Sequence, residues 1–117
     1  RSYPHIVINT IEKIENDFLL SPSHAFHLFR IAQESVNNAL RHSRAKEITV
    51  TIESTADTWK TLIADDGTGI KKENSNQSGG NGLNHMKERA AEAGWRIEWL
   101  NNPTGGTTVA ISPATIN

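Results

Sequence analysis

The stretch Gln33 to Ser43, QESVNNALRHS, decides the interpretation of this chain, because it continues two stripes of one helix. Apolar residues recur at spacings of three and four, at Ala25, Phe29, Ala32, Val36 and Ala39 or Leu40. Such spacing predicts a helix face that packs on a core. A polar stripe has the same period, and its members are Arg30, Glu34, Asn37 or Asn38 and Arg41, with His42 beside them.

The polar stripe has two interpretations. Asparagine has a weaker helix propensity than the lysine, glutamate and alanine that usually occupy a solvated face. Adjacent Asn37 and Asn38 therefore indicate either an ordinary surface stripe or a binding site. In such a site, oxygens of glutamate and asparagine would meet a hard cation, while Arg41 and His42 would meet its anion.

The composition limits the possible functions. The 117 residues fit one domain with a real core. Cysteine is absent, which excludes disulfides and thiolate metal sites. With 12 basic and 13 acidic residues, the chain lacks the basic excess typical of nucleic-acid binding. We find no 18-residue apolar run and no signal peptide, and we expect a cytoplasmic domain. Because the sequence begins abruptly at Arg1, we expect a piece of a longer protein.

The first half of the chain predicts a strand, a long helix and a hairpin. Mixed periodicity favours an edge strand near residues 6–13. Ser21 is a good N-cap and Pro22 suits a first helical turn, so a helix is predicted from Pro22 to about Ser43. Clean alternation over 47–53 predicts a half-buried strand, and a turn at 54–58 leads to a second strand over 59–64.

The second half begins with residues 71–81, KKENSNQSGGN, which contain no apolar side chain. Such a segment is either an ordinary surface loop or a mobile lid. A helix is predicted over 82–93, with Gly94 ending it. Its buried face should consist of Leu83, Met86, Ala90 and Ala93. Strands follow over 95–99 and 107–112. The pattern predicts an α+β fold, with helices on one face of a mixed, mostly antiparallel sheet.

Three short motifs could carry chemistry, and each is weak alone. Asp65 to Gly69, DDGTG, follows a strand and is either a tight turn or a site where a carboxylate accepts a proton from an amine such as that of adenine. Gly80-Asn81-Gly82 at a helix start could cradle a phosphate, although neither the dinucleotide fingerprint nor the P-loop applies. Gly105-Gly106-Thr107 could be only a hairpin turn.

The order of these motifs is far more specific than any one of them. A helical E-x-x-x-N followed by R-H, then D-x-G-x-G, a polar lid closed by G-x-G-L, and finally G-T, resembles the ATP-binding domain of sensor histidine kinases. That domain belongs to the gyrase-like, Bergerat-fold ATPase superfamily and is a two-layer α/β sandwich. The segments QESVNNALRHS, DDGTGI, GNGLNHMKERA and PTGGTTV are most similar to the nitrate-sensor and degradation-sensor subfamily. The resemblance extends from about Leu20 to Ser112.

The resemblance implies ATP and Mg²⁺ as cofactors and a role for each matching residue. Asn38 would hold Mg²⁺ with support from Asn37, Glu34 would orient groups near the γ-phosphate, and Arg41 would bind the phosphates beside His42. Asp65 would read adenine. The other nucleotide-binding positions would be Gly67, Gly69 and Ile70 in the pocket, Gly80, Gly82 and Leu83 at the lid, and Thr107 through an adenine-bound water. Glu34, Asn38 and Arg41 would form the catalytic set.

The resemblance also implies a phosphoacceptor histidine outside this chain. None of the five histidines has the acidic and arginine neighbours that an acceptor helix needs; His24 and His27 fit surface or packing positions. The lid is short and lacks a phenylalanine-containing box, as in the named subfamily. The expected partner is therefore the kinase's own dimerisation domain, with the response regulator as an indirect partner. No contact with nucleic acid or directly with the membrane is expected.

Three alternatives remain open at this stage. Anti-sigma factor kinases use the same fold to phosphorylate serine on a partner, although the segments NALRHS and GLNHMKER argue against this function. A nucleotide-binding switch without kinase activity is a second alternative, and the presence of Glu34, Asn38 and Asp65 together disfavours it. The third is a small interaction domain that binds no nucleotide.

Overall fold

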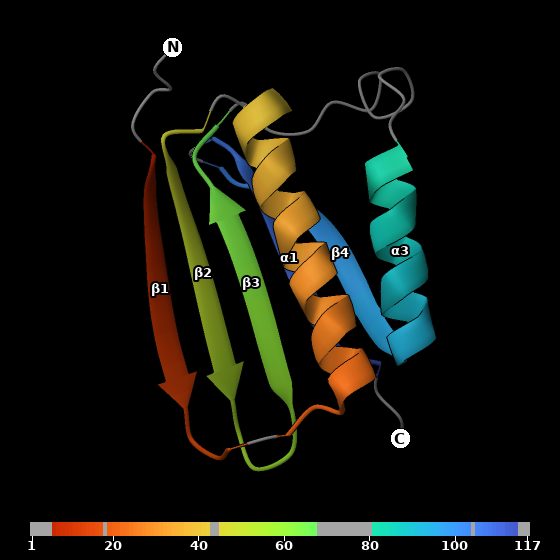
Figure 1. Cartoon of the computed structure of the whole chain (residues 1–117). Coiled ribbons are helices and arrows are strands. Elements are labelled where there is room, and N and C mark those ends of the chain that lie inside the picture. Colours follow the sequence, from red (N-terminus) through yellow and green to blue (C-terminus); the bar gives the residue numbers. More distant parts are fainter. Residues whose placement is uncertain (1–5, 18, 43–44, 68–80, 104, 115–117) are drawn as a thin grey trace.

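The computed structural model describes residues 6–17, 19–42, 45–67, 81–103 and 105–114. These residues form a five-stranded sheet and two helices that lie on the same face of it (Figure 1). The elements are β1 (Val7–Ile14), α1 (Pro22–His42), β2 (Glu47–Ser54), β3 (Trp59–Asp65), α3 (Asn81–Ala93), β4 (Trp95–Asn101) and β5 (Thr107–Pro113). The predicted α+β fold is confirmed. Neither helix is long and apolar enough to cross a membrane.

The sheet is mixed, as predicted. Its strand order is β1-β2-β3-β5-β4, with β1 at one edge. β1 runs parallel to β2, whereas the β2–β3, β3–β5 and β4–β5 pairs are antiparallel. Parallel neighbours need a long crossover connection, and α1 supplies it between β1 and β2. The short connections after β2 and β4 allow the two predicted antiparallel hairpins.

The core lies between the sheet and the helices. Alternate residues of the strands are buried on the helix-facing side, including Ile48, Ile63, Val109 and Ile111. Helix α3 contributes the predicted Met86, Ala90 and Ala93, while Leu83 is half-buried against the same cluster. Alternation with period two in the strands and spacings of three and four in α3 therefore produce one shared apolar layer.

The helix termini follow the predicted capping residues. The backbone N–H of His24 donates to the Ser21 hydroxyl at 3.1 Å, which is the usual N-cap bond. Gly94 follows α3 with a φ of 78°, and its N–H donates to the Ala91 carbonyl at 3.0 Å. Glycine adopts this left-handed conformation without the penalty of a Cβ atom.

The predicted apolar face of α1 was only partly right. Ala25 is exposed, and the side chain of Phe29 is 60% exposed. The most deeply buried residues of the helix are Ile31, Ser35 and Ala39. Ser35 can occupy the core because its hydroxyl donates to the Ile31 carbonyl at 2.8 Å, which satisfies the polar group within the helix. A search for apolar side chains alone overlooks such a residue.

Candidate nucleotide site

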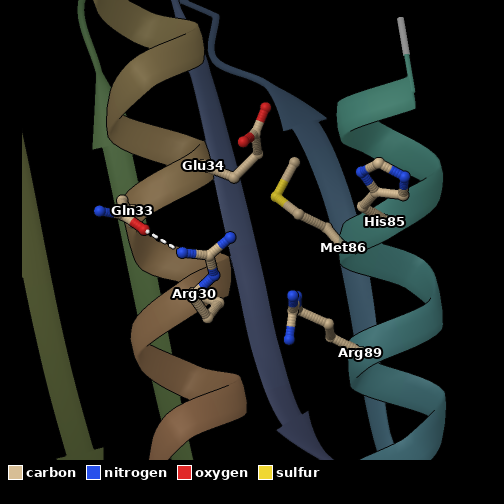
Figure 2. Close-up of a pocket in the computed structure, with 6 residues that line it drawn as sticks. All are labelled: Arg30, Gln33, Glu34, His85, Met86 and Arg89. Atoms are coloured by element: carbon tan, nitrogen blue, oxygen red, sulfur yellow. Dashed lines mark hydrogen bonds between the residues drawn. The ribbon is translucent and has the colours of Figure 1, made fainter.

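The polar stripe of α1 continues along the helix from Arg30 to Arg41. Glu34 and Asn38 are half-buried, while Asn37 and Arg41 are exposed. Glu34 faces α3 (Figure 2), and Asn38 and Arg41 follow it by four and seven residues on the same helical face. An amide, a carboxylate and a guanidinium therefore point to a common side, as the second interpretation of the stripe requires.

Asp65, predicted to read adenine, lies at the same end of the molecule as the end of α1. Figure 1 shows that α1 ends, β3 ends and α3 begins at this end. Asp65 is the last residue of β3 and pairs with Ile48 near the start of β2. Because Ile63 is buried on the helix-facing side, Asp65, two residues later, points to that side as well. The fold thus brings the carboxylate beneath the helix layer.

The Asp65 carboxylate is held by two backbone donors. The N–H of Gly67 donates to its Oδ1 at 2.8 Å, and the N–H of Thr107 donates to the same oxygen at 3.4 Å. The first bond closes the turn after β3, and the second ties β3 to β5. Since both of these donors belong to the main chain, the fold itself helps to place the carboxylate.

Two glycines let the turn before β5 approach Asp65. Gly106 has a φ of 95°, and a Cβ atom built on it would stand 1.9 Å from the Asp65 carbonyl oxygen. Gly105 has a φ of 109°, and its Cβ would lie 3.5 Å from the Gly67 carbonyl oxygen. Only glycine fits at Gly106 without moving the backbone. The segment Gly105-Gly106-Thr107 is therefore a hairpin turn that also forms one wall around Asp65.

Thr107 carries a buried hydroxyl that lacks a partner. The residue is 3% exposed, and its Oγ1 makes no hydrogen bond to any part of the chain that the structure describes. An unsatisfied buried hydroxyl costs free energy, so its presence calls for an explanation. Its location beside the Asp65 carboxylate fits a polar ligand or a ligand-bound water that completes the pair.

Asp66 has a different role from its neighbour. Its Oδ1 accepts hydrogen bonds from the N–H groups of Lys46 at 2.8 Å and Glu47 at 3.0 Å. Both bonds favour the charged form and therefore lower the pKa of Asp66 from its ordinary value of 3.8. The bond from Glu47 has the larger effect. Asp66 fastens the start of β2 to the end of β3. The motif DDGTG therefore combines a carboxylate beneath the helices with a structural one.

A residue that the sequence analysis overlooked completes this region. Asn102 donates from Nδ2 to the Asp65 carbonyl oxygen at 3.3 Å, and its Oδ1 accepts a hydrogen bond from the Thr108 hydroxyl at 2.8 Å. It lies in the Asn-, Pro- and Gly-rich turn, where asparagine is common for purely local reasons. Nothing in the local sequence distinguishes an asparagine that reaches across to another strand.

The described side chains do not form a metal site by themselves. No group of three or more histidine, aspartate or glutamate side chains that could hold a metal occurs in the described part of the chain. Mg²⁺ often keeps several waters and substrate phosphates as ligands, with one or two protein oxygens. The half-buried amide of Asn38 beside Arg41 fits such a site, in which the phosphates supply the remaining ligands.

Several predicted positions lie outside the described residues. These are Gly69, Ile70 and Gly80, together with most of the predicted lid. The His42 side chain is also not described, although its backbone closes α1. Gly82 is the second residue of α3, and Leu83 follows it on the helix. Their predicted contacts with phosphate stay predictions.

Comparisons with known proteins agree with this geometry. The family model described as "Histidine kinase-, DNA gyrase B-, and HSP90-like ATPase" matches residues 23–115. Sensor histidine kinase LiaS of Bacillus subtilis is 38% identical over 85 residues, covering 73% of this chain and 23% of LiaS. The nitrate/nitrite sensor NarX of Escherichia coli is 36% identical over 94 residues, covering 80% of this chain and 16% of NarX. The chain thus spans less than a quarter of these two relatives.

The fold has a counterpart among solved structures. The ATP-binding domain of PrrB from Mycobacterium tuberculosis superposes with a TM-score of 0.72, at 21% identity, over 92% of this chain and 79% of that one. At this identity the likeness supports the fold alone. The overall fold is therefore shared with a protein of very different sequence.

Proposed function

The chain belongs to the histidine kinase-, DNA gyrase B- and HSP90-like ATPase family, and from this premise we propose that it is the catalytic domain of a two-component sensor kinase. It binds Mg-ATP and donates the γ-phosphoryl group to a histidine on a separate dimerisation domain. A response regulator then receives the phosphoryl group from that histidine. The observation that carries the proposal is the fixed Asp65 carboxylate beside the unsatisfied Thr107 hydroxyl.

The adenine end of the site is read by hydrogen bonding. Asp65 accepts a hydrogen bond from the exocyclic amine of adenine, since an ionised carboxylate is acceptor-only. Gly106 keeps the surrounding backbone close, and Thr107 supplies a hydroxyl to a water at the base. Guanine presents a carbonyl oxygen where adenine presents this amine, so the same carboxylate would repel GTP.

The phosphate end lies along the stripe of α1. Bound Mg²⁺ would neutralise phosphate charge, with Asn38 as its protein ligand. Arg41 binds phosphate oxygens, because its guanidinium remains charged and presents several donors. Phosphoryl transfer depends mainly on positioning and on neutralising charge, and these residues provide both. In the transfer a bond forms between the imidazole nitrogen and the γ-phosphorus while the bond from that phosphorus to ADP breaks.

Glu34 lies one turn before Asn38, on the side of α1 that faces α3. From this position it orients groups near the γ-phosphate, including the incoming histidine. Gly82 and Leu83 at the start of α3, with the preceding lid, close over the phosphates. These assignments rest on the family's motif order together with the placement of Glu34 and Asn38.

The metal assignment is tested by calorimetric titration of ATP with and without Mg²⁺. Asn38→Ala should lose the Mg²⁺-dependent part of the affinity, whereas Gln33→Ala, which removes an exposed amide of the same helix outside the predicted nucleotide site, should keep it. Thermal unfolding of both variants serves as the control for folding. If Asn38→Ala binds Mg-ATP as tightly as the parent domain, Asn38 is not the metal ligand.

A further inference from the structure

A small pocket lies between α1 and α3, next to Glu34 (Figure 2). Its volume is ≈ 50 Å³, and its lining consists of Arg30, Gln33, Glu34, His85, Met86 and Arg89. This volume holds a few water molecules or one small polar group, so a nucleotide does not fit. The side chains of Arg30 and Arg89 approach the space from the two facing helices (Figure 2).

The two arginines are held in place without an opposite charge. Arg30 donates from Nη1 to Gln33 Oε1 at 3.2 Å. The Arg89 guanidinium lies over the Phe26 ring, 5.5 Å from its centroid, in a cation–π contact. Among the described residues the ion pairs are Lys13–Glu53 and His27–Glu92, so neither arginine has a carboxylate partner there.

The pocket has an excess of positive charge. Its lining contains two guanidinium groups and the single carboxylate of Glu34. A guanidinium presents donors in a planar fork that matches a carboxylate. We propose that this pocket binds the carboxylate of an aspartate or glutamate side chain on the helix that carries the phosphoacceptor histidine. The proposal rests on the proposed function for the identity of this partner.

The position of the pocket supports this partner. Arg30 precedes Glu34 by one helical turn, and Asn38 lies about 12 Å farther along the axis than Arg30. A protein segment that contacts both Arg30 and Glu34 therefore runs toward the predicted phosphate site. Phe26, which is 54% exposed, lies beside Arg89 and offers an apolar contact at the outer end. Aromatic residues and arginine are enriched in protein interfaces.

The first test uses the 117-residue chain and the nuclear magnetic resonance signals of arginine Nε–H groups. The probe is the α-amide of N-acetylglutamate, which carries one carboxylate, and the control is its glutamine counterpart, which carries none. We expect saturable shifts at Arg30 and Arg89 with the carboxylate probe only. Arg96, exposed on β4 outside the pocket lining, is the internal reference.

Variants make the binding test specific. In Arg30→Ala, the affinity for the probe, measured from the saturation of the Arg89 shift, should fall by about tenfold. This is the change expected for the loss of one charge-assisted hydrogen bond. Arg96→Ala should leave it unchanged. The carboxylate site would be overturned if the shifts at Arg30 and Arg89 were no larger than the shift at Arg96. It would also be overturned if Arg30→Ala bound the probe with the same affinity as the parent. A stronger response to inorganic phosphate than to the carboxylate would also overturn it.

The second test measures autophosphorylation of the kinase that contains this domain. Arg89→Glu should slow transfer by about tenfold or more, because it places a like charge against the acidic side chain. Arg30→Glu, on an exposed residue, repeats the test in case Arg89→Glu unfolds the domain. ATP affinity of both variants should stay unchanged, whereas a failed proposed function would abolish ATP binding in the parent. Transfer at the parent rate by Arg30→Glu and Arg89→Glu would contradict the docking assignment.

Discussion

Gly106 lies directly against the backbone of Asp65, so closely that a Cβ atom would stand 1.9 Å from the Asp65 carbonyl oxygen. This contact brings the start of β5 to the end of β3 and allows the Thr107 N–H to reach the Asp65 carboxylate. The adenine-binding geometry that we propose therefore depends on a residue without a side chain. A turn that looks ordinary in the sequence has a long-range role.

Gly106→Ala should destabilise the domain severely. A left-handed φ costs a residue with a Cβ roughly 1–2 kcal/mol, and overpacking adds roughly 1–3 kcal/mol. Gly105→Ala is the matched control, since it also has a positive φ but its Cβ meets nothing closer than 3.5 Å. Urea unfolding measures both variants. Equal losses in the two would show that backbone conformation alone, and not the contact with Asp65, requires glycine at Gly106.

Thr107→Val should affect stability and binding in opposite directions. Removing an unsatisfied buried hydroxyl should keep or raise the free energy of unfolding by about 1 kcal/mol. The loss of a water-mediated contact to adenine should weaken ATP binding by roughly 2- to 10-fold. The control is Thr61→Val, because Thr61 is also buried with an unpartnered Oγ1 but lies away from Asp65, within β3. If both variants leave ATP affinity unchanged, the Thr107 hydroxyl has no part in the site.

Asp66 should make the free energy of unfolding depend on pH in the acidic range. Hydrogen bonds from Glu47 and Lys46 lower its pKa in the folded state from the ordinary 3.8. A carboxyl group of this kind stabilises the fold fully above its unfolded pKa, and the contribution disappears as the pH falls through the lowered folded pKa. Urea midpoints of the parent and of Asp66→Asn should therefore differ at pH 6 and converge below about pH 3.8. A constant difference across this range would refute the assigned role.

The observed buried face of α1 predicts that alanine substitutions at Ile31 and Phe29 lower the free energy of unfolding by different amounts. Ile31 is fully buried, so Ile31→Ala should cost about 2–5 kcal/mol. Phe29 is 60% exposed, and Phe29→Ala should therefore cost no more than about 1 kcal/mol. Chemical denaturation of both variants decides between this face and the one expected from apolar spacing. A larger loss from Phe29→Ala would favour the original prediction.

Sequence patterns predicted those features that depend on neighbouring residues. The cap at Ser21, the end of α3 at Gly94 and the hairpins follow from local backbone preferences, and all are confirmed. The burial of Ser35 was overlooked because a hydrogen bond to Ile31, rather than an apolar side chain, makes it compatible with the core. Local patterns cannot show how far a helix is rotated about its axis.

In the candidate site, too, some residues could be predicted from the sequence and others could not. The resemblance singled out Asp65 and Thr107 from the order of the motifs, and the structure brings them into contact. The separate role of Asp66 and the reach of Asn102 depend on pairings between strands far apart in the sequence. No spacing rule applies to such pairings, because the connecting segments can have any length. Only the register of β2, β3 and β5 reveals them.

The most direct test of the proposed function is calorimetric titration of Mg-ATP into the parent domain, Asp65→Asn and Asp66→Asn. Asp65→Asn should lose one charge-assisted hydrogen bond to adenine, roughly 1.5–3 kcal/mol, which is about 10- to 100-fold in affinity. Asp66→Asn, with the same change one residue later, should bind as the parent does at neutral pH. Equal affinities for the parent and Asp65→Asn, or no binding of ATP by the parent domain, would contradict the account.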